Sequence, residues 1–304
     1  MSSTPIFHFV PQVADARQPA RRMVPALLLL AALLPAAPPA RAAAGTLDVE
    51  RFRPAAGPGR LIGEEQPEVL EHLGFATSLL LGYSAEPLVF ASPTRGRITV
   101  VSDKVGMDFT AAFGLWGRAE LGAVLPATLS MSGEAPPALE GEGLPAGEGQ
   151  GLGDLRLALK VALVQGGPFA LSLVALGSLP TGSEERYRGD GDLGGSIAAT
   201  SQLDLGPVAL VLNGGYRLRQ VEALPGTYGG DEIIFGGGGL FRLVPDRLDL
   251  RAELSGATGV GSSAFGGESE TALETRLAAA FQPSRTVWLL LGMGIPVLHG
   301  VGTP

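Results

Sequence analysis

Alternation of apolar and polar residues beyond residue 45 constrains the fold of this chain more than any other feature. In residues 248–255, LDLRAELS, leucine or alanine occupies every second position, and a charged or polar residue stands between them. Similar segments cover residues 118–129, 154–163, 208–219 and 270–281. Because successive side chains of a strand point to opposite faces, each segment predicts a strand with one apolar and one polar face. Each segment also has roughly the ten residues that a tilted transmembrane strand needs.

The connections between these segments alternate between short and long. Short turns are predicted at residues 115–118, 165–168, 204–207, 244–247 and 282–285, and longer loops at 84–96, 131–152, 181–192, 222–230 and 259–267. Barrels of bacterial outer membranes have short periplasmic turns and long outer loops, which produces this alternation, whereas a soluble β-sandwich has no reason to sort its loops in this way. The sequence therefore predicts an all-β, antiparallel transmembrane β-barrel in an outer membrane.

Eleven strands can be placed on the sequence. They are Leu73–Tyr83, Arg97–Leu115, Arg118–Ser130, Gly153–Val164, Phe169–Leu179, Leu193–Leu203, Val208–Val221, Ile233–Val244, Leu248–Thr258, Glu268–Phe281 and Thr286–Met293. Bacterial barrels normally have an even number of strands, and an unpaired strand leaves backbone groups without partners in lipid. We therefore expect about twelve strands, with the closing strand supplied by sequence after Pro304 or by part of residues 48–72.

The first 44 residues have the pattern of a cleaved signal peptide. Arg17, Arg21 and Arg22 precede the apolar run Val24–Leu34, and small residues with A-x-A spacing follow at 40–44. We expect cleavage after Ala42 or Ala44, an entry segment at residues 45–72 and the barrel at residues 73–304. Export to the outer membrane implies contact with its lipid, and with the barrel-assembly machinery during insertion.

The polar faces of the strands carry charges of both signs. Because Arg or Lys on the lipid side would cost about 2–4 kcal/mol at mid-membrane, we expect these charges to face the lumen. The lumen-facing candidates are Asp154, Arg156, Lys160, Arg217, Arg219, Asp249, Arg251, Glu253, Glu270, Glu274 and Arg276. They would either pair across strands and close the lumen or line a narrow, water-filled pore.

Six aromatic residues lie close to the short turns and are candidates for a girdle at the membrane interface. They are Phe113, Trp116, Phe169, Phe241, Phe281 and Trp288. The alternative is that they are ordinary core aromatics. The glycine run at residues 236–239 predicts a kink or close packing within a strand, since no Lys-Ser or Lys-Thr follows it as a phosphate-binding loop requires.

Composition argues against several other functions. The net charge is −8, and it is −11 without residues 1–44, which hold four of the 22 basic and one of the 30 acidic residues. An acidic chain without a basic stripe is a poor nucleic-acid binder. The chain has no cysteine, and its three histidines, at 8, 72 and 299, lie near no nucleophile motif. We expect no enzyme activity, no cofactor and no metal site, and we interpret the acidic segments at 134–148 and 184–192 as solvated loops.

Two stretches resemble known outer-membrane families. Residues 151–155, GLGDL, followed by residues 179–182, LPTG, resemble the strand start and strand end that bracket a hairpin in the phenol meta-pathway outer-membrane family. Residues 48–54, DVERFRP, with Gly57-Pro58-Gly59 after them, are similar to the entry segment of an OmpA-family subgroup whose N-terminal half is a barrel. These resemblances imply an integral outer-membrane barrel with a structural or passive small-solute channel role. The alternatives are a transporter for small hydrophobic or aromatic compounds and a surface binding module that uses the long acidic loops.

Overall fold

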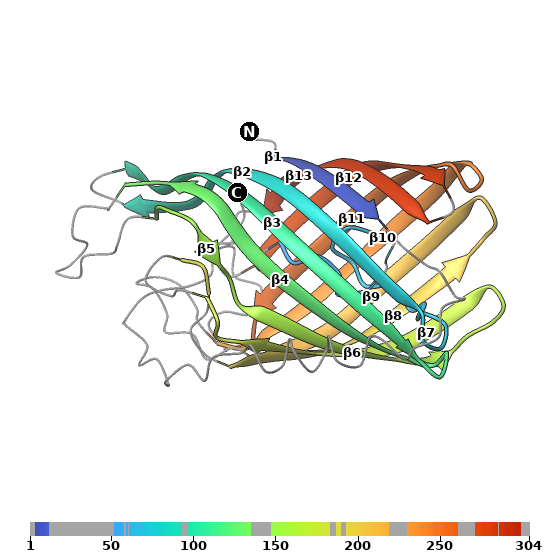
Figure 1. Cartoon of the computed structure of the whole chain (residues 1–304). Helices are drawn as coiled ribbons and strands as arrows, with labels where there is room; N and C mark the ends of the chain where they lie inside the picture. Colours follow the sequence, from blue (N-terminus) through green and yellow to red (C-terminus); the bar gives the residue numbers. More distant parts are fainter. Residues whose placement is uncertain are drawn as a thin grey trace.

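The computed structural model describes residues 4–11, 52–57, 59, 61–92, 96–134, 147–182, 187–189, 193–218, 230–260, 271–284 and 286–298. These residues form thirteen strands of one antiparallel sheet (Figure 1). The strands are β1 Thr4–Pro11, β2 Phe75–Ser92, β3 Gly96–Leu115, β4 Ala119–Ser132, β5 Gly151–Leu152, β6 Leu155–Val164, β7 Phe169–Leu179, β8 Gly194–Asp204, β9 Val208–Leu218, β10 Glu232–Val244, β11 Leu248–Gly259, β12 Thr271–Ser284 and β13 Val287–Leu298.

Twelve of these strands form a closed ring. Neighbours in sequence pair with each other from β2 to β4 and from β6 to β13, β4 pairs with β6, and β1 lies between β2 and β13. The two-residue β5 pairs with β4 beyond the end of β6. The prediction of an all-β antiparallel barrel of about twelve strands is therefore confirmed. No helix among the described residues is long and apolar enough to cross a bilayer.

The closing strand comes from an unexpected part of the chain. We expected it after Pro304 or within residues 48–72, but Thr4–Pro11 occupies this place. It pairs antiparallel with β13 from Thr4↔Gly294 to Pro11↔Val287 and with β2 from Ile6↔Gly82 to Phe9↔Leu79. β1 falls inside the residues predicted as a signal peptide, and the signal peptide stays a prediction.

The eleven strands placed from the sequence correspond to β2–β4 and β6–β13, mostly within three residues at each end. The largest difference is the predicted long loop at 84–96. β2 and β3 instead stay paired as far as Ser92↔Gly96, with irregular register between Ala85 and Val89. Leu88 lies there in a buried cluster with Val100, Val101, Met131 and Tyr187, so apolar packing extends this hairpin beyond its neighbours.

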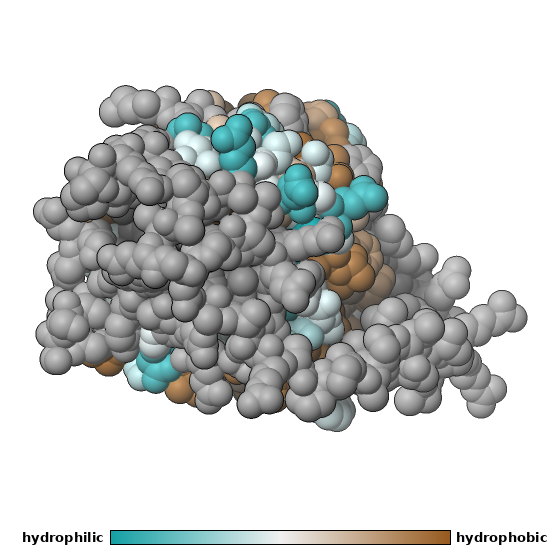
Figure 2. Space-filling model, turned by 90° about the vertical axis from the view of Figure 1, so that its left-hand side faces the viewer, coloured by the Kyte–Doolittle hydropathy of each residue, from teal (hydrophilic) through white to brown (hydrophobic). Residues whose placement is uncertain are grey.

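The barrel has an apolar outer face and a polar inner face. Along β6, Leu157, Leu159 and Val161 are exposed, while Arg156 and Lys160 between them are buried. A protein surrounded by water on its outside would show the reverse pattern. Figure 2, which looks at the end of the barrel where the long connections lie, shows brown hydrophobic side chains on the flank behind the grey atoms. The outer face therefore suits an apolar surrounding.

Short connections of two to four residues close one end of the barrel. In the β3–β4 turn, Trp116 and Gly117 have φ values of 53° and 62°. Both central residues of a type I′ turn need positive φ, and this turn matches the right-handed twist of the paired strands. A positive φ is energetically unfavourable for Trp116, which has a Cβ atom, but not for Gly117, which has none. The short turns thus set the register of the hairpins at this end.

We predict that the apolar outer face contacts lipid hydrocarbon. Leu212, in the middle of β9, and Leu193, beside the start of β8, are 69% and 67% exposed, so the same substitution can be compared at two depths. Leu212→Arg should lower the free energy of unfolding by about 2–4 kcal/mol, and Leu193→Arg by about 0–1 kcal/mol. Urea titration in phospholipid vesicles, followed by tryptophan fluorescence, measures both values. Equal losses would contradict a bilayer around the middle of the barrel.

Candidate functional site

The lumen of the barrel is occupied by the chain itself. Residues 52–57, 59 and 61–72, here called the internal plug, lie inside the ring and lead into β2 at the short-turn end. There the backbone N–H of Leu73 donates to the carbonyl of Gly114 at 2.9 Å, and His72 Nδ1 accepts the backbone N–H of Trp116 at 3.1 Å. The missing side chain of Gly114 leaves room for the carbonyls of Leu70 and Glu71.

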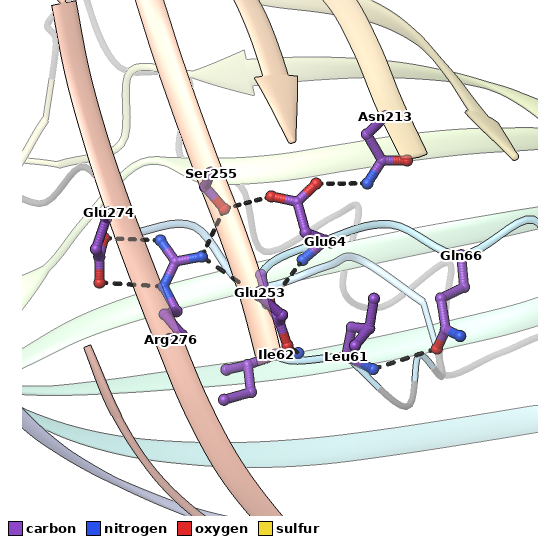
Figure 3. Close-up of polar contacts among 10 residues, drawn as sticks. Leu61, Ile62, Glu64, Gln66, Asn213, Glu253, Ser255, Glu274 and Arg276 are labelled. Atoms are coloured by element: carbon purple, nitrogen blue, oxygen red, sulfur yellow. Dashed lines mark hydrogen bonds and ion pairs between the residues drawn. The ribbon is translucent and has the colours of Figure 1, made fainter. Parts of the chain in front are cut away.

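Glu253 on β11 holds the middle of the plug. Its carboxylate accepts the backbone N–H groups of Ile62, Gly63 and Glu64 at 2.5, 2.9 and 3.3 Å (Figure 3). The side chain is only 3% exposed. Three successive amides directed at one carboxylate stabilise its buried negative charge, which would otherwise be costly. The same contact fixes the position of a plug segment that has no regular secondary structure of its own.

Glu64 extends this contact to two further strands. Its carboxylate accepts hydrogen bonds from Ser255 Oγ on β11 and, at 2.5 Å, from Asn213 Nδ2 on β9. Burial raises the pKa of Glu64 above its ordinary value, and the nearby charge of Glu253 raises it further. The hydrogen bonds from Ser255 and Asn213 and the charge of Arg276 act in the opposite direction. The pKa of this plug carboxyl is therefore raised by its place in the lumen.

A buried cation on the opposite wall binds the plug as well. Lys160 Nζ on β6 lies 2.9 Å from Glu65 of the plug and 3.5 Å from Glu120 of β4. Glu65 also accepts the backbone N–H of Ala56, and Glu120 accepts that of Leu70 at 2.9 Å. Removing one member of such a group would leave a buried charge without compensation.

Neutral polar side chains of the wall bind the plug backbone nearer the short turns. Ser172 Oγ donates to the carbonyl of Pro67 at 2.6 Å, and Thr200 Oγ1 donates to the carbonyl of Glu65 at 2.7 Å. A bond between two side chains adds to these, since Gln66 Nε2 of the plug donates to Gln202 Oε1 of the wall at 2.9 Å. The plug is thus hydrogen-bonded to strands on several sides of the ring.

Apolar plug side chains fill pockets of the inner wall. Ile62 packs in a cluster with Leu80, Ala280, Trp288 and Leu290, and Leu61 packs in a second cluster with Ala209, Val211 and Leu240. Side chains at Gly236 and Gly238 of β10 would collide with Glu64 and Leu61. The expectation of close packing within residues 236–239 is therefore confirmed at Gly236 and Gly238, and the plug is what packs against these two residues.

Arg276 on β12 joins the plug to two wall strands. It makes a bidentate pair with Glu274, with the shorter distance 2.8 Å, and donates to Ser255 Oγ at 2.8 Å. Its guanidinium lies 4.7 Å from the ring centre of Phe52. A planar cation can form a two-pronged pair and stack on a ring at the same time. Gly63 passes so close to Arg276 that a side chain at this position would collide with it.

Most of the charges predicted to face the lumen lie in the barrel interior. The residues that are at most 8% exposed are Asp154, Arg156, Lys160, Asp249, Arg251, Glu253, Glu274 and Arg276. Arg217 is partly buried, with its side chain 20% exposed, and pairs with Glu232 at 2.9 Å. Arg219 and Glu270 lie outside the described residues. The structure brings Glu253, Glu274 and Arg276 together, and it places Arg156 against Asp108 at 3.3 Å.

The six candidate interface aromatics separate into two groups. Trp116, Phe169, Phe241 and Phe281 are 44–76% exposed on the outer face or turns, and Phe113 is half-buried. Trp288 is 8% exposed, packs around Ile62 and lies under the guanidinium of Arg251 at 5.5 Å. The prediction that Trp288 belongs to a lipid-facing girdle is therefore wrong, because its position in β13 directs the indole towards the interior.

The plug was not predicted from the sequence. Residues 45–72 were expected to be an entry segment or a source of the closing strand, and Glu64, Glu65 and Asn213 were not selected as site residues. Two features of the sequence indicated a segment of this kind. Residues 64–72, EEQPEVLEH, are polar without strand alternation, and the glycine run in β10 implied a close neighbour.

The two motifs GLGDL and LPTG meet at the long-connection end of β6 and β7. The hydroxyl of Thr181 accepts the backbone N–H of Leu155 at 2.8 Å and donates to the carbonyl of Gly153 at 2.9 Å. Asp154 accepts the backbone N–H of Gly182 at 2.8 Å. The motif residues therefore fasten the open end of this hairpin.

A protein-family model matches part of the chain. The family model described as "Putative MetA-pathway of phenol degradation" matches residues 99–222, which are less than half of the chain and contain both motifs. No curated protein matches the chain. The resemblance to the phenol meta-pathway family is confirmed over these residues, whereas the OmpA resemblance stays a prediction.

We predict that Glu253→Ala loosens the internal plug. Each buried N–H left without an acceptor costs about 1–3 kcal/mol, and three would lose theirs. Because the chain has no native cysteine, Ala55→Cys provides a single reporter in the plug. Its rate of labelling by a bulky thiol reagent should rise at least about tenfold in Glu253→Ala. Asp204→Ala, which removes an ion pair with Arg242 at the short turns, is the control and should leave the rate unchanged.

The raised pKa of Glu64 predicts a pH dependence. The folded protein favours protonated Glu64, so the stability from this carboxyl is fully present below its ordinary value of 4.5 and declines as pH rises through the raised pKa. Urea titrations from pH 4 upward should show this decline in the unmodified protein. It should be smaller in Glu64→Gln, which cannot ionise, and unchanged in Glu134→Gln at an exposed site. Identical pH profiles for all three proteins would contradict the role of Glu64.

Proposed function

We propose that the chain is an integral outer-membrane barrel of transport type, and that the internal plug controls the passage of small solutes through its lumen. The long connections would face outward, the short turns would face the periplasm, and outer-membrane lipid would surround the apolar face. This orientation follows the usual arrangement of such barrels. Insertion by the barrel-assembly machinery belongs to the same proposal.

The observation that carries the proposal is the attachment of the plug to the inner wall. In an empty channel the charged residues of the wall would be hydrated. In this structure Glu253 and Glu120 instead accept hydrogen bonds from the plug backbone, and Lys160 forms an ion pair with the plug. Between the two alternatives for the lumen charges, this arrangement favours a closed lumen in the resting state. Release of the plug would expose the same charges and wet the lumen.

A transporter for small hydrophobic or aromatic compounds is the second candidate. It is favoured by a cavity of about 180 Å³ between the plug and the wall, and by the family model that matches residues 99–222. The third candidate, a surface binding module, would use acidic loops that lie largely outside the described residues. We propose no catalytic role, and His72 Nδ1 accepts the backbone N–H of Trp116.

We predict that the unmodified protein, extracted from the outer-membrane fraction, conducts weakly in planar bilayers. Glu253→Ala should raise the mean conductance several-fold, because the plug is then held less tightly in the lumen. Asp204→Ala should match the unmodified protein. A large, stable conductance without any substitution would show that the plug does not close the lumen. Recovery of the protein only in a soluble periplasmic extract would overturn the proposed location.

A further inference from the structure

A cavity lies on the side of the internal plug that faces the long connections. Its volume is about 180 Å³, and its floor includes Arg53 and residues 63–65 of the plug. Its walls come from the halves of β6–β12 that lie towards the long connections. An apolar protein cavity of about 150 Å³ can bind benzene. The space beside the plug is therefore large enough for one molecule with a single six-membered ring.

The charges that line the cavity are matched within the protein. Arg156 pairs with Asp108, Arg217 pairs with Glu232, and Arg276 pairs with Glu274. Among the lining carboxylates, Glu65 pairs with Lys160, and Glu64 accepts hydrogen bonds from Asn213 and Ser255. Because these groups already have ion-pair or hydrogen-bond partners within the protein, this part of the lining favours a neutral ligand over a charged one.

Apolar side chains from opposite parts of the ring line the rest of the cavity. They are Val174, Leu176, Ala198, Ile234, Ala257 and Ala272. These side chains belong to β7, β8, β10, β11 and β12, so they border the space along a continuous part of the ring. An apolar body would be buried between them, which is the usual construction of a small-molecule site.

The side-chain amide of Asn213, which belongs to the lining, has an acceptor without a hydrogen-bond partner in the described part of the chain. Asn213 donates through Nδ2 to Glu64, and its Oδ1 points away from that carboxylate (Figure 3). This Oδ1 is buried and has no hydrogen-bond partner among the residues that the structure describes. A carbonyl oxygen accepts hydrogen bonds and cannot donate one. A ligand that supplies a hydroxyl or amine hydrogen at this point would satisfy it.

We propose that this cavity binds a small neutral molecule with an apolar ring-sized body and one hydrogen-bond donor, and that the donor is held by Asn213 Oδ1. The inference rests on the proposed transport function and names the class of solute that binds beside the plug. A molecule of the same shape without the donor would leave the buried oxygen unsatisfied and bind more weakly.

Fluorine NMR of the intact protein in detergent micelles tests the proposal with matched probes. 4-Fluorophenol and 4-fluorotoluene have nearly the same shape and differ in a hydroxyl against a methyl group. 4-Fluorophenol should bind at least about tenfold more tightly. Ala198→Phe, which places a ring in the cavity, should abolish binding of both probes and measures partition into the micelle. Asn213→Leu should remove the preference for the hydroxyl.

Each other outcome overturns a defined part of the proposal. Equal affinities for the two probes would remove the role of Asn213, and tighter binding of 4-fluorobenzoate would show that the ligand is an anion. Equal signals from the unmodified protein and Ala198→Phe would mean that no site exists in the cavity. These results leave the proposed function standing if Glu253→Ala still raises conductance. A soluble location would overturn the proposed function without affecting the binding measured in micelles.

Discussion

A sheet with an apolar outer face has to pair every backbone N–H and C=O within itself, and the rest of this structure depends on that requirement. The sheet meets it by closing into a ring of twelve strands. β2 and β13 both run from the short-turn end towards the long connections, so the strand between them has to run the other way. Thr4–Pro11 satisfies this direction, and it joins the two neighbouring strands by pairing with residues 287–294 of β13 and residues 79–82 of β2.

Closure creates an interior that has to be filled. Alternation along each strand directs charged side chains such as Glu253 and Lys160 inward, because the outer face cannot hold them. Once inside, these charges need partners, and opposite charges on the wall satisfy only some of them. The backbone amides of residues 62–64 and the carboxylate of Glu65 complete the set. The charges of the lumen are therefore stabilised in part by the internal plug, and the plug is held in place by those charges.

Small residues make this arrangement possible in space. Gly236 and Gly238 of β10 and Gly114 of β3 let the plug approach the wall more closely than any side chain would permit. Where the wall instead carries Ala198 and Ala257, the plug does not fill the space, and the cavity remains. The same inner wall thus has regions that hold the plug and a region that accommodates a small ligand, which links closure of the lumen to the chemistry of a solute.

Sequence alone determined eleven of the strands, the short turns and the two faces of this protein, because alternation with a period of two is a local property of the chain. It placed β6 and β11 nearly to the residue and selected Glu253 and Arg276 as inward charges. Only the tertiary structure decided which strand closes the ring and what fills it. Those contacts join residues as far apart as 62 and 253, and no local pattern encodes a partner at that separation. Trp288 shows the same limit, since its place near a turn was visible in the sequence, whereas its packing against Ile62 of the plug is a contact between distant parts of the chain.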